Sequence, residues 1–506
     1  MEQEFDISKI KRIHFIGIGG VSMSGLAKWC RLNGFIVSGS DKTPSFQTDA
    51  LKSFGIKVFP SHSAKNISGA EAVVYTSAVA EDNEELVAAK KLGLPVIKRS
   101  ELLGYALRKY PRSVAVAGSH GKTTVTAMLW EIFEAACEKP AVFLGGEYGA
   151  RGNFTAGGKP LKYAIAEACE YKSNFLDIKP SVCVILNVDN DHLESFGGAE
   201  AEREAFKKFA ANGVSVINAD DEGALYAASE SSVTFGIKNS AVFTAKNLTA
   251  GKNGKGYSFT AYEYGVRLGR ITLKVGGRHN VYNALAAVAV ARISGISFCT
   301  VKKALFAFSG VKRRNEELGT FLEKKVFADY AHHPTEIKAF LQAKREENKR
   351  FAVVFQPHTY SRTRLLKSEF VSVLSAEPRI IIYKTYPARE RYEKEGDAKT
   401  LYEELFKEKL KRFGGNGGGE TDYKSDGESG GTNRSEIGGT KAGEIGNNSG
   451  GQSLPCKGCL KCSLPLYAET EEELINAIKL RISGAEEILF VGAGDIYEIA
   501  LKLIKS

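Results

Sequence analysis

The chain of 506 residues lacks any apolar run near the ~20 residues that a membrane-spanning helix needs. Its first ten residues, MEQEFDISKI, are polar and mixed in charge, unlike a signal peptide. Long blocks of lysine and arginine with interleaved aromatics are also missing, although the formal net charge is +10. We therefore expect a cytoplasmic protein with no membrane insertion and no nucleic-acid partner.

Cysteines are few, eight in all, and five of them are scattered, as is typical of reduced thiols in the cytosol. The other three form a C-x2-C-x2-C cluster: Cys456, Cys459 and Cys462. Structural zinc or an iron–sulfur cluster normally needs a fourth ligand, and the surrounding segment 414–463 offers no further Cys or His. The interpretation of a lineage-specific thiol cluster without a metal is favoured, and a metal site stays open.

The length predicts about three domains, and no internal repeat at solenoid spacing is present. Short apolar runs alternate with helical patterns almost throughout, which predicts α/β domains built on parallel sheets. We expect a Rossmann-like N-terminal domain (1–110), a P-loop ATPase-like central domain (111–311) and a Rossmann-like C-terminal domain (312–506). An insert in the last domain, 414–463, is dominated by glycine and small polar residues and is expected to be disordered.

Two segments of the central domain carry more specific patterns. Residues 242–276 alternate as antiparallel strands do, and 279–295 form a long, almost uncharged pattern that predicts a buried helix. In all three domains, ligands are expected at the carboxyl ends of the parallel strands.

The sharpest motif is AGSHGKTT, residues 117–124, which follows an expected strand and opens an expected helix. Its glycines let backbone N–H groups close on phosphate oxygens, Lys122 can reach the β- and γ-phosphates, and Thr123 or Thr124 can ligate Mg²⁺. Val116 stands where the general P-loop pattern has its first glycine. The motif predicts that the chain binds ATP or GTP.

An earlier turn, FIGIGGVSMSGLA at 15–27, is followed by Asp41 and taken alone indicates a nicotinamide dehydrogenase. The fingerprint is incomplete, because Ser22 stands where its third glycine belongs. An oxidoreductase would also leave Lys122 without a purpose. The turn still suits phosphates, and the question is which ones it binds.

Nine motifs occur in an order that resembles the Mur ligases of peptidoglycan synthesis: GIGGVSMSGLA, GSHGKTT, EACEYKSNFL, NVDNDHLE, GRHNVYNALAA, GVKRRNE, DYAHHPTEI, FQPHTYSRT and VGAGDIY. They span Gly17 to Tyr497 and omit only the insert. The resemblance implies an ATP-dependent ligase that joins L-alanine to the lactyl carboxylate of UDP-N-acetylmuramate through an acyl phosphate and a tetrahedral intermediate. It implies ATP and Mg²⁺ (or Mn²⁺) as cofactors and a monomer or weak dimer.

Two other functions remain open within this frame. A ligase that reattaches a recycled murein tripeptide to the same sugar is the nearest, since it shares both turns. A binding module with a degenerate P-loop is the other, and it predicts no phosphate release.

The resemblance also assigns residues by motif. In EACEYKSNFL it makes Glu167 the Mg²⁺ ligand, with Glu170 acting through water, whereas Cys169 and Lys172 replace acids of the commoner pattern. The expected metal ligands are Thr123, Glu167 and His192, the last for a second metal. The expected catalytic residues are Lys122, Glu167, His192, Arg313 and Arg314.

The remaining assignments concern ATP and the substrates. Asn280 and Asn283 are placed near the adenine, with helix capping as the alternative; the histidine pair His332 and His333 is read as substrate contact rather than a metal site. The ATP set is Gly118, Ser119, His120, Gly121, Lys122, Thr123, Thr124, Asn280, Asn283 and Asp329. The UDP-sugar and amino-acid set is Gly17, Gly19, Gly20, Ser22, Met23, Ser24, Gly25, Asp41, Tyr330, His332, Arg362 and Arg364.

Overall fold

The computed structural model describes residues 7–189, 196–414 and 463–505. The contacts within the chain divide it into two compact units, Met1–Lys312 and Arg313–Ser506. Three sequence predictions lie outside the described residues: the metal ligand His192, nearly all of the insert, and its three cysteines. Within the described ranges, every helix is too short or too polar to cross a membrane.

The first unit begins with a five-stranded parallel sheet of order β3-β2-β1-β4-β5. Successive residues of β1 point to opposite faces of the sheet: Phe15 packs in one apolar cluster and Ile16 in another. The strand order reverses between β1 and β4, which is where an α/β sheet binds its ligand. The elements are β1 (Arg12–Ile16), α1 (Val21–Leu32), β2 (Ile36–Ser40), α2 (Phe46–Ser53), β3 (Lys57–Phe59), β4 (Ala72–Tyr75), α3 (Glu84–Lys91), β5 (Val96–Lys98) and α4 (Arg99–Leu107).

The same unit continues into a ten-stranded sheet of order β15-β14-β13-β12-β11-β10-β6-β9-β7-β8. Its strands are β6 (Arg112–Ala117), β7 (Ala141–Phe143), β8 (Phe154–Ala156), β9 (Tyr163–Glu167), β10 (Val182–Ile185), β11 (Val214–Asn218), β12 (Val233–Gly236), β13 (Phe243–Ala250), β14 (Tyr257–Glu263) and β15 (Val266–Leu273). Along this order, each strand from β13 to β7 is parallel to the next, whereas β14 is antiparallel to both β13 and β15, and β8 is antiparallel to β7.

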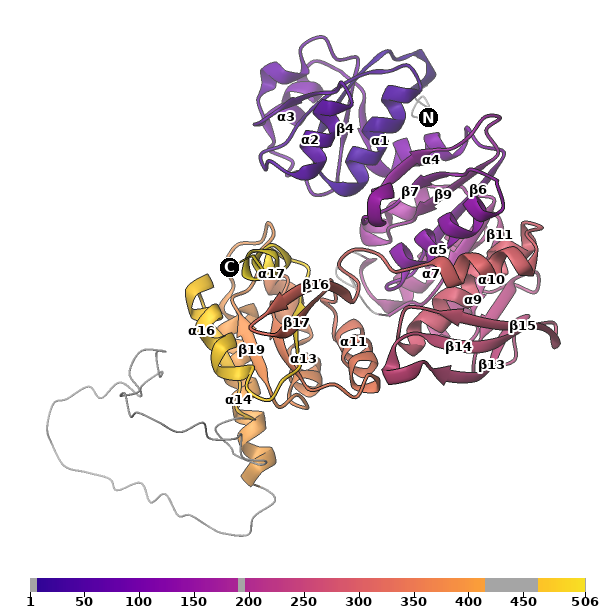
Figure 1. Cartoon of the computed structure of the whole chain (residues 1–506). Coiled ribbons are helices and arrows are strands. Elements are labelled where there is room, and N and C mark those ends of the chain that lie inside the picture. Colours follow the sequence, from indigo (N-terminus) through magenta and orange to yellow (C-terminus); the bar gives the residue numbers. More distant parts are fainter. Residues whose placement is uncertain (1–6, 190–195, 415–462, 506) are drawn as a thin grey trace, which may run out of the picture. The chain divides into compact units, whose positions relative to one another are not determined.

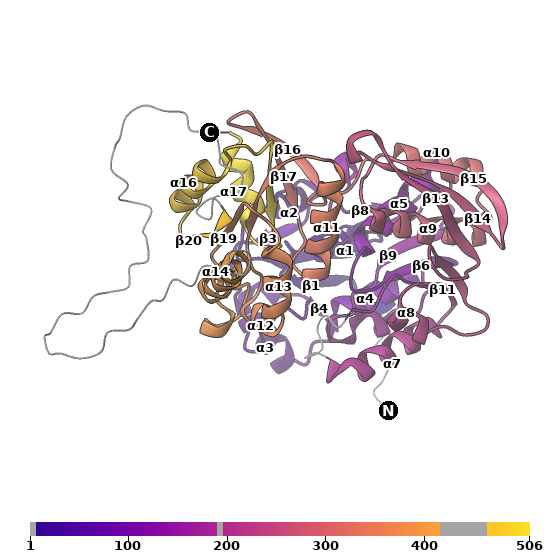
Figure 2. The same ribbon diagram turned by 90° about the horizontal axis from the view of Figure 1, so that it is seen from below.

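Helices cover both faces of this sheet. On one face α5, α9 and α10 pack together over β6, β9 and β11 to β15 (Figure 1 and Figure 2). Helix α9 is buried along almost its whole length because its residues are small or apolar on every side. The helices of the sheet are α5 (Lys122–Ala135), α7 (Ala199–Ala210), α8 (Glu222–Tyr226), α9 (Arg278–Ile293) and α10 (Phe298–Ala307).

The second unit is built on a six-stranded sheet of order β16-β17-β21-β18-β19-β20, parallel except for the edge strand β16. Its strands are β16 (Glu316–Phe321), β17 (Lys324–Asp329), β18 (Phe351–Phe355), β19 (Ile380–Tyr383), β20 (Leu466–Ala468) and β21 (Glu487–Val491). Its helices are α11 (Pro334–Glu346), α12 (Tyr360–Leu365), α13 (Lys367–Leu374), α14 (Ala398–Gly414), α16 (Glu471–Arg481) and α17 (Ile496–Leu503).

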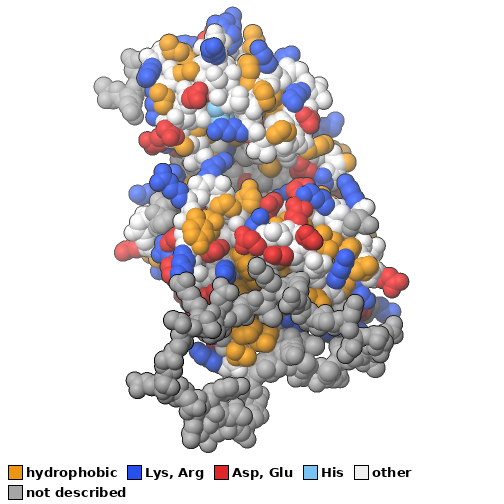
Figure 3. Space-filling view, turned by 90° about the vertical axis from the view of Figure 1, so that its left-hand side faces the viewer, with side chains coloured by type: hydrophobic (Ala, Val, Ile, Leu, Met, Phe, Trp, Pro, Cys, Tyr) orange, Lys and Arg blue, Asp and Glu red, His pale blue; other side chains and the backbone are white. Residues whose placement is uncertain are grey.

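The expected fold class is confirmed: three α/β domains dominated by parallel strands. The antiparallel segment and the buried helix of the central domain are confirmed as well, as β13 to β15 and α9. On the face drawn in Figure 3, lysine and arginine side chains are interspersed with aspartate and glutamate. The exact domain boundaries stay a prediction, with the division between the two units at Lys312 and Arg313.

Candidate functional site

The P-loop connects the carboxyl end of β6 to the first turn of α5. Gly118 has φ +134° and Gly121 has φ +87°, a region that side chains other than glycine rarely adopt. A Cβ on Gly121 would also lie 2.6 Å from Oδ1 of Asn283. Both glycines are therefore required by the turn, and the first N–H groups of α5 have no acceptor within the helix, as an anion-binding helix start requires.

Lys122 lies against this loop and against an acid of the EACEYKSNFL motif. Its Nζ donates to the carbonyl oxygens of Gly118 at 2.5 Å and Ser119 at 3.1 Å, and to Oε1 of Glu170 at 2.9 Å. Burial by itself would lower the pKa of Lys122, but its acidic neighbours, above all Glu170 and with it Glu167, together outweigh burial and hold that pKa above its usual value. The lysine therefore stays a cation at neutral pH.

Thr123 and Glu167 form the second feature of the loop. The Thr123 hydroxyl donates to Oε2 of Glu167 at 3.0 Å, and the backbone N–H of Gly145 donates to Oε1 of the same carboxylate. Glu167 ends β9, the strand next to β6, so parallel pairing carries its side chain to the P-loop. A hydroxyl oxygen and a carboxylate oxygen at a P-loop are the hard ligands that suit Mg²⁺.

Glu170 and Cys169 complete this side of the loop. Glu170 is only 3% exposed, and within the described part of the chain its Oε2 makes no hydrogen bond. An acceptor buried in this way fits a role in holding a metal through water. Burial, aided by the charge of Glu170, raises the pKa of the Cys169 thiol, so this position adds no negative charge.

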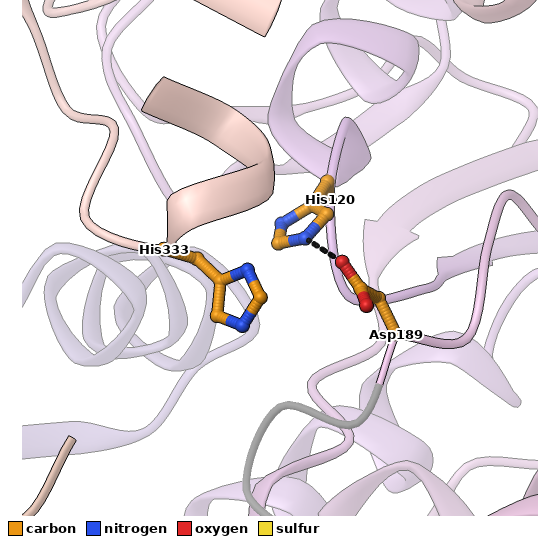
Figure 4. Close-up of side chains that lie close together, drawn as sticks. All are labelled: His120, Asp189 and His333. Carbon is orange, nitrogen blue, oxygen red and sulfur yellow. Dashed lines mark hydrogen bonds and ion pairs between the residues drawn. The ribbon is translucent and has the colours of Figure 1, made fainter. Parts of the chain in front are cut away.

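The loop after β10 forms hydrogen bonds with Ser119 and His120 of the P-loop. The side chain of Asn187 accepts from the His120 N–H at 2.7 Å and donates to the His120 carbonyl at 3.1 Å. The Ser119 hydroxyl accepts from the Asp189 N–H at 2.8 Å, and His120 Nε2 lies 3.1 Å from the Asp189 carboxylate (Figure 4). The sequence analysis did not single out Asn187 or Asp189, although both lie in the NVDNDHLE motif.

The predicted adenine contacts lie at the start of α9. Asn280 donates to the Gly276 carbonyl at 2.7 Å, and Asn283 donates to Oδ1 of Asn280 at 3.0 Å. Both side chains are buried, and Asn283 also borders Gly121 of the P-loop. The structure therefore brings Asn283 to the predicted ATP site, while its contact with adenine stays a prediction.

The first glycine turn connects β1 to α1. Gly17 has φ +77°, and the N–H groups of Gly17 and Ile18 both donate to the Ser40 carbonyl, at 2.8 and 3.0 Å. The Gly19 N–H donates to the Asp41 carboxylate at 2.9 Å, and a Cβ on Gly19 would lie 2.8 Å from the same oxygen. The turn is thus held to the end of β2, with the N-terminus of α1 directly behind it.

The other glycine-turn residues predicted to bind the UDP-sugar lie at or within the start of α1, and their side chains have different contacts. Ser22 accepts a hydrogen bond from Arg99 at 3.1 Å, which supplies a cation that the sequence analysis missed. Ser24 is fully buried and donates to the Val21 carbonyl at 2.8 Å, and Met23 is buried too. Gly20 is the N-cap of α1, and Gly25 lies within that helix.

In the second unit, Asp329 ends β17 and is buried. Its two carboxylate oxygens accept from the N–H groups of Asn315, at 2.7 Å, and Ala331, at 2.8 Å. Burial raises the pKa of Asp329 to about 6, although Arg314 acts against that shift. Arg314 itself pairs with Glu336 at 3.3 Å, and its guanidinium lies 5.4 Å from the Tyr330 ring centre.

The other predicted residues of this unit gather at the ends of β17 and β18. His332 has its ring 5.8 Å from that of His358, and Arg362 donates to the His358 carbonyl at 3.1 Å. Arg364 instead pairs with Glu393 at 2.6 Å. Arg313 stacks 4.2 Å over the ring of Tyr497, so a residue of the GVKRRNE motif contacts one of the VGAGDIY motif. The roles of these residues toward ATP and substrate stay predictions.

Two models of known protein families match the first unit, one over each of its two sheets. The Mur ligase middle domain matches residues 116–291, and the Mur ligase family catalytic domain matches residues 12–111. The UDP-N-acetylmuramate–L-alanine ligase of Clostridium beijerinckii is 35% identical over all of both chains. The ligase of the same name from Acetivibrio thermocellus is 43% identical over 81% of this chain and 88% of its own. The chain belongs to the Mur ligase family.

Solved structures agree with this placement. The UDP-N-acetylmuramate–alanine ligase MurC of Thermotoga maritima superposes with a TM-score of 0.75 at 29% identity, covering 98% of each chain. A murein peptide ligase from Psychrobacter arcticus has a TM-score of 0.65 at 19% identity, which shows a shared fold alone.

Proposed function

We propose that the chain is an ATP-dependent ligase that forms the amide between L-alanine and the lactyl carboxylate of UDP-N-acetylmuramate, releasing ADP and phosphate. The reaction belongs to the synthesis of peptidoglycan precursors, and we place it in the cytoplasm, in a monomer or weak dimer. The observation that carries the ATP-dependent step is the P-loop, where Lys122 and the Thr123–Glu167 pair lie on one turn. The choice of L-alanine rests on the relatives that span most or all of the chain.

The two glycine turns divide the binding work in this proposal. The turn at Gly17–Gly20 and the start of α1 hold the diphosphate of the UDP-sugar, with Arg99 beside Ser22 as a nearby cation. The turn at Gly118–Gly121 holds the phosphates of ATP. Both turns belong to one compact unit, so the same unit presents substrate and nucleotide.

Chemistry requires a carboxylate to attack the γ-phosphorus of ATP, an approach of two anions. The bond from that phosphorus to the ADP oxygen breaks as the acyl phosphate forms. Lys122 offsets the charge on the phosphates by turning from Glu170 and the loop carbonyls toward them. The amine of L-alanine then attacks the acyl carbon, and a tetrahedral intermediate loses phosphate and a proton to leave the amide.

A divalent cation fits the residues beside the P-loop. Thr123 and Glu167 would hold Mg²⁺ directly and Glu170 through water, and the ion would supply charge neutralisation between the phosphates and the carboxylate. His192, outside the described residues, is assigned to a second ion by the family resemblance. Arg313 or Arg314 is assigned to the γ-phosphate on the same ground.

A phosphate-release assay with UDP-N-acetylmuramate, ATP, Mg²⁺ and a panel of amino acids tests the proposal. We expect release to depend on the sugar and to be fastest with L-alanine. Release that depends on a murein tripeptide instead would reassign the chain to the recycling activity. No release with any acceptor, with ATP still bound, would favour a binding module.

A further inference from the structure

We propose that Asn153 is a positioning residue that couples binding of the UDP-sugar at the first glycine turn, Gly17–Gly20, to binding of nucleotide and metal at the P-loop. The inference rests on the proposed function, because it takes the two turns as the two ligand sites. Asn153 lies in neither turn. It comes just before β8, in the hairpin that β7 and β8 form at the edge of the ten-stranded sheet.

The side chain of Asn153 holds the helix that follows the first turn. Its Nδ2 donates to the Val21 carbonyl at 2.5 Å and to the Ser24 hydroxyl at 3.0 Å. Its Oδ1 accepts from Lys28 at 3.4 Å, and the residue is only 5% exposed. The first turn of α1, whose N–H groups would face the diphosphate, is therefore fixed by a residue of the central domain.

The backbone of Asn153 continues toward the P-loop. Its carbonyl accepts from the Leu144 N–H at 2.9 Å, across the hairpin. The next residue, Gly145, donates its N–H to Glu167, and Glu167 accepts the hydroxyl of Thr123. The first turn of α1 and the predicted metal ligands are thus connected through one hairpin, by hydrogen bonds of Asn153 and Gly145 and by the covalent backbone between Leu144 and Gly145.

Close packing leaves this hairpin little room to move independently. A Cβ on Gly145 would lie 2.7 Å from the Glu167 carboxylate, and one on Gly146 would lie 2.9 Å from Cγ2 of Thr123. On the other side, a Cβ on Gly25 of α1 would lie 3.5 Å from Cβ of Phe154. A ligand that orders one turn therefore acts on the arrangement of the other, and by linkage the effect is reciprocal.

Calorimetry tests the inference as a coupling factor. The Kd of UDP-N-acetylmuramate is measured on the full chain, with and without a non-hydrolysable ATP analogue and Mg²⁺. For the unsubstituted chain we expect the analogue to change that Kd by about fivefold or more. In Asn153→Ala we expect each ligand to bind alone and the coupling factor to fall within about twofold of unity. Asn153→Asp keeps the size of the side chain but cannot donate to Val21 and Ser24, so we expect the same loss of coupling. This variant replaces Asn153→Ala in the test if the alanine variant folds poorly.

Tyr110→Phe is the matched control. The Tyr110 hydroxyl accepts from Trp29 of α1 at 3.2 Å and donates to the Ala156 carbonyl of β8 at 3.1 Å. It thus joins the same helix to the same hairpin without touching Leu144 or Gly145, and we expect its coupling factor to be unchanged.

The outcomes separate the two proposals. Normal coupling in both Asn153 variants, equal loss in Tyr110→Phe, or no coupling in the unsubstituted chain would each overturn the role of Asn153. Failure of the unsubstituted chain to bind UDP-N-acetylmuramate at all would instead overturn the proposed function.

Discussion

The two glycine turns of the first unit have the same strand–turn–helix connection but differ in the side chains around them. Each follows the first strand of its sheet and leads into a helix, and each contains glycine at positive φ. At the first turn, the Gly19 N–H is held by the Asp41 carboxylate, and Arg99, from another helix, donates to Ser22. At the second turn, a lysine and a threonine follow the last glycine directly and meet two acids.

This difference separates binding from chemistry. Backbone N–H groups at a helix start recognise a diphosphate but cannot neutralise the charge that develops during phosphoryl transfer. In the proposed function Lys122, Thr123 and Glu167 can neutralise it, because a cation and two candidate metal ligands lie beside one turn. Substitutions at the second turn should therefore reduce turnover, and those at the first should weaken substrate binding.

The largest effect short of removing the lysine is expected for Glu167→Gln. The variant keeps a side chain of the same size but loses the charge that would hold Mg²⁺ beside Thr123. We expect kcat for phosphate release to fall by about 10²–10³-fold, with a higher Mg²⁺ requirement. Glu138→Gln is the control, since Glu138 only pairs with Lys162. Activity of Glu167→Gln above a tenth of normal would contradict the metal assignment.

A smaller effect, of a different kind, is expected for Gly19→Ala. The new Cβ would lie 2.8 Å from the Asp41 carboxylate and displace the turn. We expect KM for the UDP-sugar to rise about tenfold, roughly the loss of one hydrogen bond to a charged group, with little change in kcat. Asp49→Asn is the control, because the Asp49 side chain of the same domain is exposed and pairs with Lys52. A fall in kcat alone would erase the distinction between the turns.

The smallest effect concerns acid stability beneath the first turn. Burial would raise the pKa of Glu85, but the imidazole of His14, 3.6 Å away, and hydrogen bonds from Ser40 and Asn66 outweigh burial and lower the pKa to about 2. A carboxyl with a depressed pKa stabilises the fold above its unfolded value, near 4.5, and this stability is lost as pH falls toward 2.

The Tm gap between the unsubstituted chain and Glu85→Gln should therefore narrow as pH is lowered through that window. Scanning calorimetry at several pH values measures it, with the exposed neighbour Glu84→Gln as the control. A Tm difference that stays the same at every pH would show that the charge of Glu85 does not contribute to the stability of the fold.

Much of this arrangement could be predicted from the sequence, because local signals encode it. Alternating apolar runs predicted the parallel sheets, and the spacing of glycines, Lys122 and Thr123 predicted the second turn. The residues that brace the turns were missed because they depend on distant contacts. Asn153 contacts Val21 and Ser24 across more than a hundred residues, and the short strands β7 and β8 that carry it there have few residues to show a pattern.

Lys122→Ala tests the central claim most directly, by measuring phosphate release and calorimetric binding of UDP-N-acetylmuramate, without nucleotide, on the same preparation. The account predicts that release falls by at least about 10³-fold, as expected when charge stabilisation at the phosphates is lost, while the Kd of the UDP-sugar stays within about twofold. Near-normal phosphate release, or loss of UDP-sugar binding together with turnover, would contradict the account.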